Sequence, residues 1–237
     1  MREEIWKGMK VIHHDFPIDQ YYKKKTEKKQ ICLHHLASGG NPDNVQSDIN
    51  WWKSTKERVA TCVAISRDGT IHTLFDSKYW AHHLGIKIKA FDKEGVKRVY
   101  KKKPNGKSYV SNNTDLNKAT IGLELDSWGP LTRRNGKYYS WTNTEVKEEN
   151  VVFYPTRYKG HNYYEKYTPE QIGSTRLLLI HWKEEYGIDI SYKGDKMFDV
   201  CKEALEGEEG VWSHTSYRSD KSDVHPYQPL IEMLKTL

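Results

Sequence analysis

Short apolar segments separated by segments of helical periodicity are the feature of this sequence that most restricts its fold. Residues 30–36 (QICLHHL) and 119–125 (ATIGLEL) each have the length and the apolar character of a buried strand. Residues 59–66 and 70–75 flank a turn at 67–69, which predicts a hairpin. Strands that alternate with helices predict an α/β domain with a central mixed β-sheet flanked by helices.

Residues 169–186 are the clearest helix in the sequence. Thr168 is a good N-cap, Pro169 suits the first helical position, and Gln171 can complete a capping box. Gly187 supplies a stop signal. The face expected to be buried carries Ile172, Thr175, Leu179, Trp182 and Tyr186.

Shorter helices are expected at residues 45–56, 196–205 and 230–237, with a polar loop at 38–43 before the first of them. Val45, Ile49 and Trp52 fall on one face of that helix. Two polar segments rich in Tyr and Lys, at about 87–117 and 130–167, have only weak periodicity. We expect them to be insertions on the rim of one domain that covers residues 1–237.

The aromatic residues are unusual in kind, with 16 Tyr and 8 Trp against 5 Phe. Tyr and Trp combine an apolar ring with a polar group, which suits a solvated groove that holds sugars or peptides. They also occur in ordinary cores, and composition alone leaves both interpretations open.

The net charge of +6 favours an anionic partner, either a nucleic acid or a polymer of the cell wall. Much of the positive charge lies in lysine runs at 23–29 and 101–103, which are expected to be solvated loops. No basic segment has the aromatic spacing of a known nucleic-acid motif. Nucleic acid is therefore not the expected partner.

Membrane insertion is not expected, because no segment approaches the roughly 20 apolar residues of a membrane span. Residues 1–4 begin no apolar run of the kind found in signal peptides, so synthesis in the cytoplasm is expected. Cys32, Cys62 and Cys201 are widely spaced and form neither a disulfide framework nor a paired cysteine metal motif. They are expected to be small buried residues.

Two clusters of residues could carry chemistry. His34 and His35 lie in an apolar strand, and alternation places them on opposite faces, so that only one can point into a given site. Near the C-terminus, Lys221, Asp223 and His225 project to the same side if that segment is extended. Two histidines and one carboxylate, with water in the fourth position, form the ligand set of a hydrolytic zinc site.

Glu124 lies between these clusters, in the apolar run 121–125. Partial burial would raise the pKa of this carboxyl towards the range of a general base. The pattern fits equally well an edge strand with Glu124 facing water.

The order of these segments resembles the type-2 N-acetylmuramoyl-L-alanine amidases, a superfamily that includes phage lysozymes with amidase activity, wall-recycling enzymes and peptidoglycan recognition proteins. The matching segments run in family order from about residue 30 to 230 and leave the two insertions unmatched. They are ICLHHLASGG, VATCVAISRDGTIHTLFD, WAHHLG, NKATIGLELDSWG, YTPEQIGSTRLLL and SHTSYRSDKSDVHP.

The resemblance implies a Zn²⁺ cofactor bound by His34, His214 and Asp223. It leaves His35 to pack or to orient a neighbour. Family members usually have Asp-Pro-Gly after the lysine, whereas this chain continues from Asp223 through Val224 to His225. His225 could therefore compete as a ligand or act from behind the ligands, and Asp223 is preferred for its spacing from the lysine.

The resemblance also implies the catalytic groups. Glu124 would take a proton from the attacking water and return it to the departing amine, while Lys221 would stabilise the oxyanion. His83 would line the substrate cleft. Some relatives place a catalytic Tyr in the second strand, where this chain has Val63 beside Cys62. That departure gives the role of base to Glu124.

The implied function is zinc-dependent hydrolysis of the amide bond between N-acetylmuramic acid and L-alanine in bacterial peptidoglycan, with no obligatory protein partner. A phage lysin (an endolysin), held in the host cytoplasm until lysis, is preferred because the Tyr-rich insertions favour a large polymeric substrate. The alternatives are an intracellular amidase that recycles wall fragments and a peptidoglycan-binding protein without activity.

Overall fold

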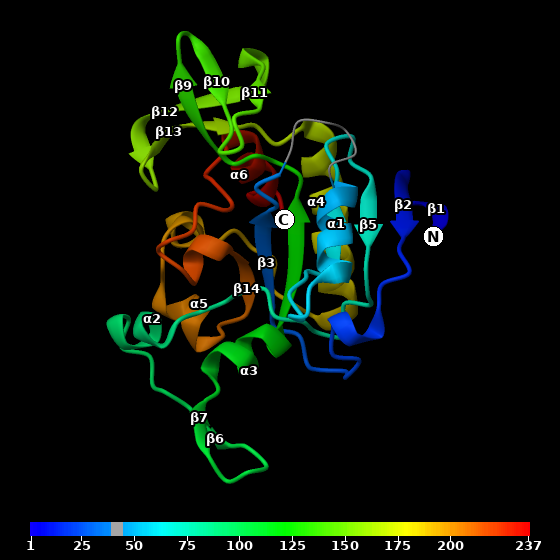
Figure 1. Cartoon of the computed structure of the whole chain (residues 1–237), viewed down its shortest axis with the longest axis vertical. Helices are drawn as coiled ribbons and strands as arrows, with labels where there is room; N and C mark the ends of the chain where they lie inside the picture. The colour runs from blue at the N-terminus through cyan, green and yellow to red at the C-terminus, as the bar shows by residue number, and fades with distance from the viewer. Residues whose placement is uncertain (39–44) are drawn as a thin grey trace.

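The computed structural model describes residues 1–38 and 45–237, so most of the expected loop at 38–43 lies outside the described residues. A seven-stranded sheet runs through the centre in the order β1-β2-β5-β4-β8-β3-β14 (Figure 1). In that order its strands are Arg2–Trp6, Met9–His13, Ile71–Thr73, Val63–Ile65, Thr120–Leu125, Gln30–His35 and Gly210–Ser213.

The sheet is mixed, as the sequence predicts. β8 is parallel to β3 and β4, β14 is parallel to β3, and β4 and β5 form the expected antiparallel hairpin. The expected strand at 59–66 is wrong in length. Only Val63–Ile65 is a strand, and Val59 forms an isolated bridge with His82 outside it. The β1–β2 hairpin was not expected at all.

Helices cover both faces of the sheet (Figure 1). α1 (Val45–Ser54) lies on one face, where Val45, Ile49 and Trp52 pack with Ala64. α4 (Pro169–Tyr186) and α6 (Gln228–Leu234) lie on the other. This arrangement confirms the predicted α/β class with a central mixed sheet.

The long helix α4 follows the sequence prediction at both ends. Thr168 Oγ1 accepts a hydrogen bond from Gln171 N at 3.1 Å, and Gln171 Oε1 accepts from Thr168 N at 3.0 Å, which completes the capping box. Gly187 ends the helix in the left-handed region with φ 74°. Four of the five residues on the expected face are buried, and Tyr186 is half-buried.

The helix predicted at 196–205 is wrong. A short 3₁₀ helix (η3, Gly194–Phe198) and α5 (Lys202–Glu206) occupy this region, separated by Asp199 and Cys201 in extended conformation. Asp199 Oδ1 accepts hydrogen bonds from Val200 N and Lys159 Nζ, which favours the break over a continuous helix. The other short 3₁₀ helices are η1 (Ile18–Gln20), η2 (Glu148–Asn150) and η4 (His214–Ser216).

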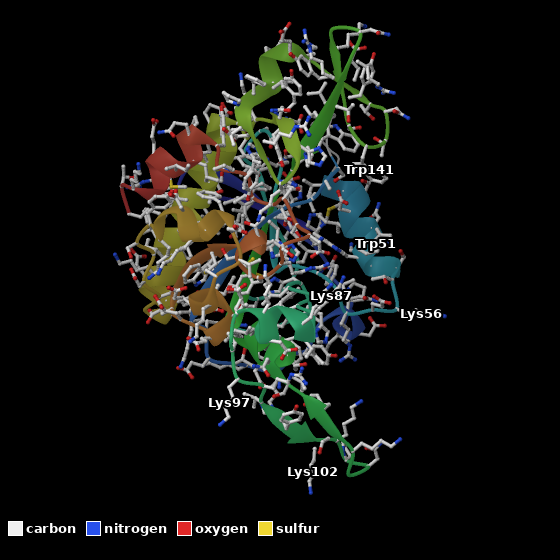
Figure 2. All side chains as sticks on the ribbon, turned by 90° about the vertical axis from the view of Figure 1, so that its left-hand side faces the viewer. Trp51, Lys56, Lys87, Lys97, Lys102 and Trp141 are labelled. Atoms are coloured by element: carbon white, nitrogen blue, oxygen red, sulfur yellow. The ribbon has the colours of Figure 1, made fainter. Side chains whose placement is uncertain are left out.

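The segment at 87–117 begins in α2 (Ile88–Lys93), which Phe91 anchors in the core, and ends in α3 (Asn112–Ala119). Between them, β6 (Tyr100–Lys102) and β7 (Ser108–Val110) form a hairpin that projects from the body (Figure 1). Figure 2 shows Lys102 on this projection and Lys97 near its base. The lysine run at 101–103 is exposed, as expected.

The segment at 130–167 forms a second sheet, which the weak periodicity did not predict. Its five strands are ordered β11-β10-β9-β13-β12 and lie beyond one end of the central sheet (Figure 1). Trp128, Leu131, Tyr138 and Val146 form a small core of its own. In chain order from β9 to β13 the strands are Pro130–Arg134, Lys137–Tyr139, Glu145–Val146, Val151–Tyr158 and His161–Glu165.

Two expectations about burial need correction, one for a lysine expected in a solvated loop and one for the cysteines expected to be buried. Lys28 is buried, and its Nζ donates hydrogen bonds to Tyr79 O and Lys118 O at 2.8 Å each. Burial lowers the pKa of this amine to about 8. All three cysteines are free thiols, yet only Cys32 and Cys62 are buried and Cys201 is half-buried. Among the described helices, none has the length and apolar character needed to cross a membrane.

Candidate functional site

His34 and Glu124 lie side by side because their strands are adjacent and parallel. His34 pairs in register with Glu124 across β3 and β8. Their neighbours Leu33 and Leu123 point into the core under α4. Alternation therefore directs His34 and Glu124 to the opposite face of the sheet.

His214 and Asp223 join His34 at the carboxyl end of the sheet. Ser213, the last residue of β14, pairs with Leu33, so His214 emerges beside His34. Thr215 N donates to Asp223 O at 3.0 Å and holds the loop that follows against this turn. His34 Nδ1 lies 3.1 Å from His214 Nδ1, and Asp223 Oδ2 lies 2.9 Å from His214 Nδ1 and 3.3 Å from His34 Nδ1.

The hydrogen bonds behind these histidines fix their tautomers. His214 Nε2 donates to Leu84 O at 2.9 Å. His83 Nε2 donates to Thr120 O at 3.4 Å, so that His83 Nδ1 accepts from His34 Nε2 at 3.0 Å. Assigned from this network, both His34 Nδ1 and His214 Nδ1 present a lone pair to the cluster.

Three atoms with lone pairs thus converge: His34 Nδ1, His214 Nδ1 and Asp223 Oδ2. Such a cluster is repulsive unless a proton or a metal ion lies within it. Burial and the neighbouring His214 lower the pKa of His34 to about 4, which leaves this imidazole neutral near pH 7. Burial opposes the charge of Asp223, but His214 and the hydrogen bonds hold the pKa of this carboxyl well below its usual range. Neutral imidazoles and an ionised carboxylate are the states that bind a metal ion.

A second group of possible ligands fits a metal ion less well. Cys32, His34 and His83 also place donor atoms near one another. However, His34 Nε2 and His83 Nδ1 already share a hydrogen bond, and burial raises the pKa of the Cys32 thiol well above its usual range. A neutral thiol is a poor ligand.

Glu124 is the least buried residue of β8 and borders the same cavity as the cluster. Burial, followed by the charge of Asp223, raises the pKa of its carboxyl well above the usual range. Among the described residues, Glu124 Oε2 has no hydrogen-bond partner. Lys221 borders the cavity as well and opposes this shift in the pKa.

His83 approaches closely because β8 has a glycine beside it. A Cβ atom on Gly122 would lie 3.0 Å from His83 Nδ1 and 2.7 Å from Thr61 Cγ2. His83 borders the cavity, but both of its ring nitrogens are bonded to protein atoms. Its contact with His34 was not foreseen from the sequence.

His225 and His35 lie outside the cluster. The expectation that Lys221, Asp223 and His225 share one side is wrong for His225, which does not border the cavity. His225 Nδ1 accepts from Tyr154 OH at 2.7 Å and Nε2 donates to Glu165 O at 3.0 Å, so both nitrogens are engaged. His35 follows His34 in β3 and points to the opposite face of the sheet, where its Nδ1 lies 3.1 Å from Tyr167 OH.

The three clustered atoms belong to residues that border a cavity of about 670 Å³, together with Glu124, Lys221 and His83. The residues that border it and were not singled out from the sequence include Trp51, Trp141 and Arg218. The exposure of Trp51 could have been inferred, because Trp52 was assigned to the buried face of the helix and an adjacent helical residue points in another direction. Arg218 lies between His214 and Lys221 in the C-terminal cluster. Trp141 had no signal, since it lies in the segment with weak periodicity.

Comparison with solved structures finds distant similarity over nearly the whole chain. The chain is 12% identical to that in "Structure of PlyL", covering 95% of each chain with a TM-score of 0.48. It is 10% identical to N-acetylmuramoyl-L-alanine amidase LysC from Clostridium intestinale URNW, covering 94% of this chain and 93% of that one with a TM-score of 0.45. An AmpD derivative is 13% identical, covering 94% and 93% with a TM-score of 0.44. A search of curated proteins finds no significant match.

The comparison with protein families is decisive. The family model described as N-acetylmuramoyl-L-alanine amidase (Amidase_2) matches residues 24–226. This range contains the strands β3, β4, β8 and β14, and the segment that carries Asp223. The chain therefore belongs to the N-acetylmuramoyl-L-alanine amidase family.

Proposed function

We propose that this protein is a zinc-dependent amidase that hydrolyses the bond between the lactyl group of N-acetylmuramic acid and L-alanine in peptidoglycan. The observation that carries the proposal is the convergence of His34 Nδ1, His214 Nδ1 and Asp223 Oδ2 within 2.9–3.3 Å of one another. Family membership supplies the reaction class.

The three donors fit zinc by their chemistry. Two imidazoles and one carboxylate leave a fourth position open, which is the arrangement of catalytic rather than structural zinc sites. Zinc bound there would act as a Lewis acid that polarises the scissile carbonyl and lowers the pKa of water. Leu84 O and His83 fix the ring orientations of His214 and His34, as partners behind metal ligands do.

The neighbouring residues supply proton transfer and charge. Glu124 accepts a proton from the attacking water, and its raised pKa makes the carboxylate basic enough for that task. It then returns the proton to the departing amine of L-alanine. Lys221 places a positive charge at the cavity wall, where it stabilises the oxyanion. His83 acts as a positioning residue for His34, and its assignment to the substrate cleft stays a prediction.

The wall-lytic role is the finer part of the proposal. Pro130, Thr132, Trp141 and His161 of the second sheet and its turns border the cavity, which extends the cleft beyond the central sheet. A long cleft suits a polymer better than a small soluble fragment. We therefore retain a phage lysin that acts on intact wall, with the fragment-recycling amidase as the alternative.

Mass spectrometry of digested peptidoglycan tests the reaction directly. The zinc-loaded protein should release stem peptides with a free L-alanine amine and leave the glycan strands uncut. Asp223→Ala should abolish the release and the zinc content together. Glu124→Gln should abolish the release and keep the zinc. Cleavage at a sugar–sugar or a peptide–peptide bond would contradict the proposal, as would binding of sacculi with no cleavage.

Turnover on intact sacculi and on a soluble muropeptide distinguishes the two biological roles. A lysin should have the higher kcat/KM, per scissile bond, on sacculi. A preference for the soluble fragment would assign the protein to recycling and remove the lysin from the proposal.

A further inference from the structure

The two exposed tryptophans of this chain, Trp51 and Trp141, both border the cavity that contains Glu124 and Asp223. Trp141 is 73% exposed and Trp51 57%. By contrast, five of the other tryptophans are buried: Trp52, Trp80, Trp128, Trp182 and Trp212. Large apolar side chains left in water beside a cavity mark a binding surface.

The fold holds each of the two rings at the surface. Trp51 lies on α1, which is fixed because Ile49 and Trp52 are buried against the central sheet. Trp141 Nε1 donates to Ala37 O at 2.6 Å, which ties the second sheet to the end of β3. Figure 2 shows Trp51 and Trp141 along the same edge of the molecule, the edge formed by α1.

The turn that carries Trp141 is itself well ordered by hydrogen bonds. Ser140 N donates to Thr144 O at 2.9 Å, Asn143 N donates to Ser140 O at 3.0 Å, and Thr144 N donates to Ser140 Oγ at 3.1 Å. A ring presented by a rigid turn loses little conformational entropy when a ligand covers it.

The two ends of the cavity differ in chemistry. Arg218, Asp220 and Lys221 border it on the side of the C-terminal loop, and Lys87 extends the charge beyond it through an ion pair with Asp220 at 3.8 Å. Figure 2 places Lys87 away from Trp141, on the far side of Trp51. The side of the C-terminal loop therefore carries both positive charges, and the side of α1 and the second sheet carries the two exposed rings beside the acidic Asp48 and Glu57.

The proposed substrate has the same polarity. The scissile amide joins a sugar to a peptide, so the substrate leaves the reaction centre in two directions. A stem peptide carries carboxylates, which suit Arg218 and Lys221. A pyranose ring has an apolar face of C–H groups that stacks on an aromatic ring, and hydroxyl and acetamido groups around its edge that need water or polar partners. Exposed tryptophans on a wet rim meet both needs.

We propose that Trp51 and Trp141 form a clamp that binds the glycan strand of peptidoglycan, with each ring stacking on a sugar. This inference rests on the proposed function, because it takes the glycan as one half of the substrate. Trp141 belongs to the segment at 130–167, so the clamp assigns a role to the second sheet, which presents one ring at the border of the cavity, near the carboxyl end of β3.

Four variants separate the clamp from a structural role. Trp51→Ala and Trp141→Ala remove the rings. Trp141→Phe keeps an aromatic ring and loses the hydrogen bond to Ala37 O together with part of the ring surface. Phe153→Ala is the matched control, since Phe153 is 55% exposed on β12 of the same sheet and does not border the cavity.

The first assay is titration of the whole protein with a β-1,4-linked N-acetylglucosamine oligosaccharide, measured by isothermal titration calorimetry. This probe has no stem peptide and contains no lactyl–alanine amide bond. We expect each Trp→Ala change to weaken binding at least about fivefold, the loss typical of a central aromatic contact. Trp141→Phe should keep most of the affinity, and Phe153→Ala all of it.

The second assay compares KM for a muropeptide with one sugar and for one with several disaccharides. The Trp→Ala variants should raise KM only for the longer glycan. Equal affinities and equal KM values in all variants would overturn the clamp, and so would a loss in Trp141→Phe as large as in Trp141→Ala. A loss confined to a glycan-free stem peptide would overturn it too. The proposed function fails separately, if the unchanged protein cuts neither muropeptide.

Discussion

A large contribution to the pH dependence of stability should come from a carboxyl group outside the site, that of Asp126. This residue follows β8, is fully buried, and has no hydrogen-bond partner for either carboxylate oxygen among the described residues. The nearby Arg67 instead contacts Glu165 Oε1 at 3.3 Å. Burial, followed by the charge of Glu165, therefore raises the pKa of Asp126 from 3.8 to about 8.

The sign of the effect follows from proton binding. Between the two pKa values the folded state holds one more proton than the unfolded state, so the free energy of unfolding falls as pH rises. The slope is about 1.36 kcal/mol per pH unit. From about pH 5 to about pH 8 the loss is about 4 kcal/mol.

The substitution Asp126→Asn removes this titration and keeps the shape of the side chain. Urea or thermal unfolding of both proteins across this pH range should show the variant gaining about 4 kcal/mol relative to the unchanged chain, or roughly 10 °C in Tm. Because both proteins retain His34, His214 and Asp223, the pH dependence of the site cancels in the difference.

Asp68→Asn is the control. Burial of Asp68 is outweighed by hydrogen bonds from Ser66 and Thr70, so the pKa of this carboxyl is lowered. It is ionised in both states above about pH 5, and its stability difference should not change with pH over the same range. If the difference in stability between Asp126→Asn and the unchanged chain is also independent of pH, the reasoning is refuted.

Three further predictions concern the site. Glu124→Gln should lower kcat by about 10²–10⁴-fold with zinc content unchanged, as measured by turnover and metal analysis; normal turnover would remove Glu124 as the base. Lys221→Ala should lower kcat by a larger factor than it raises the Kd for a muropeptide, and a change in binding alone would contradict its oxyanion role. Zinc affinity should fall as pH decreases towards about 4, where His34 takes up a proton, and a metal-binding titration that is flat with pH would contradict the ligand assignment.

The middle of the central sheet could be predicted from the sequence because β3 and β8 are almost entirely buried. Burial makes residues 30–36 and 119–125 predominantly apolar, and the register of β3 and β8 then places His34 beside Glu124. The long helix α4 was predictable from its capping box and its terminal glycine. Both signals are local, so one sequence suffices to find them.

The second sheet could not be predicted, because few positions of its strands are buried. The exposed positions of β12 remove the apolar alternation that identifies a strand. The direction of His225 was also out of reach. It depends on contacts with Tyr154 and Glu165, which lie 60 or more positions away in the chain. Trp141 was missed for the same reason, since its partner Ala37 is 104 positions away.

The position of a bound zinc ion is the measurement that tests the account most directly. Crystals of the zinc-loaded protein, measured at the zinc absorption edge, should give one anomalous peak bounded by His34 Nδ1, His214 Nδ1 and Asp223 Oδ2. A peak between Cys32, His34 and His83, or no peak at either place at full zinc loading, would contradict it.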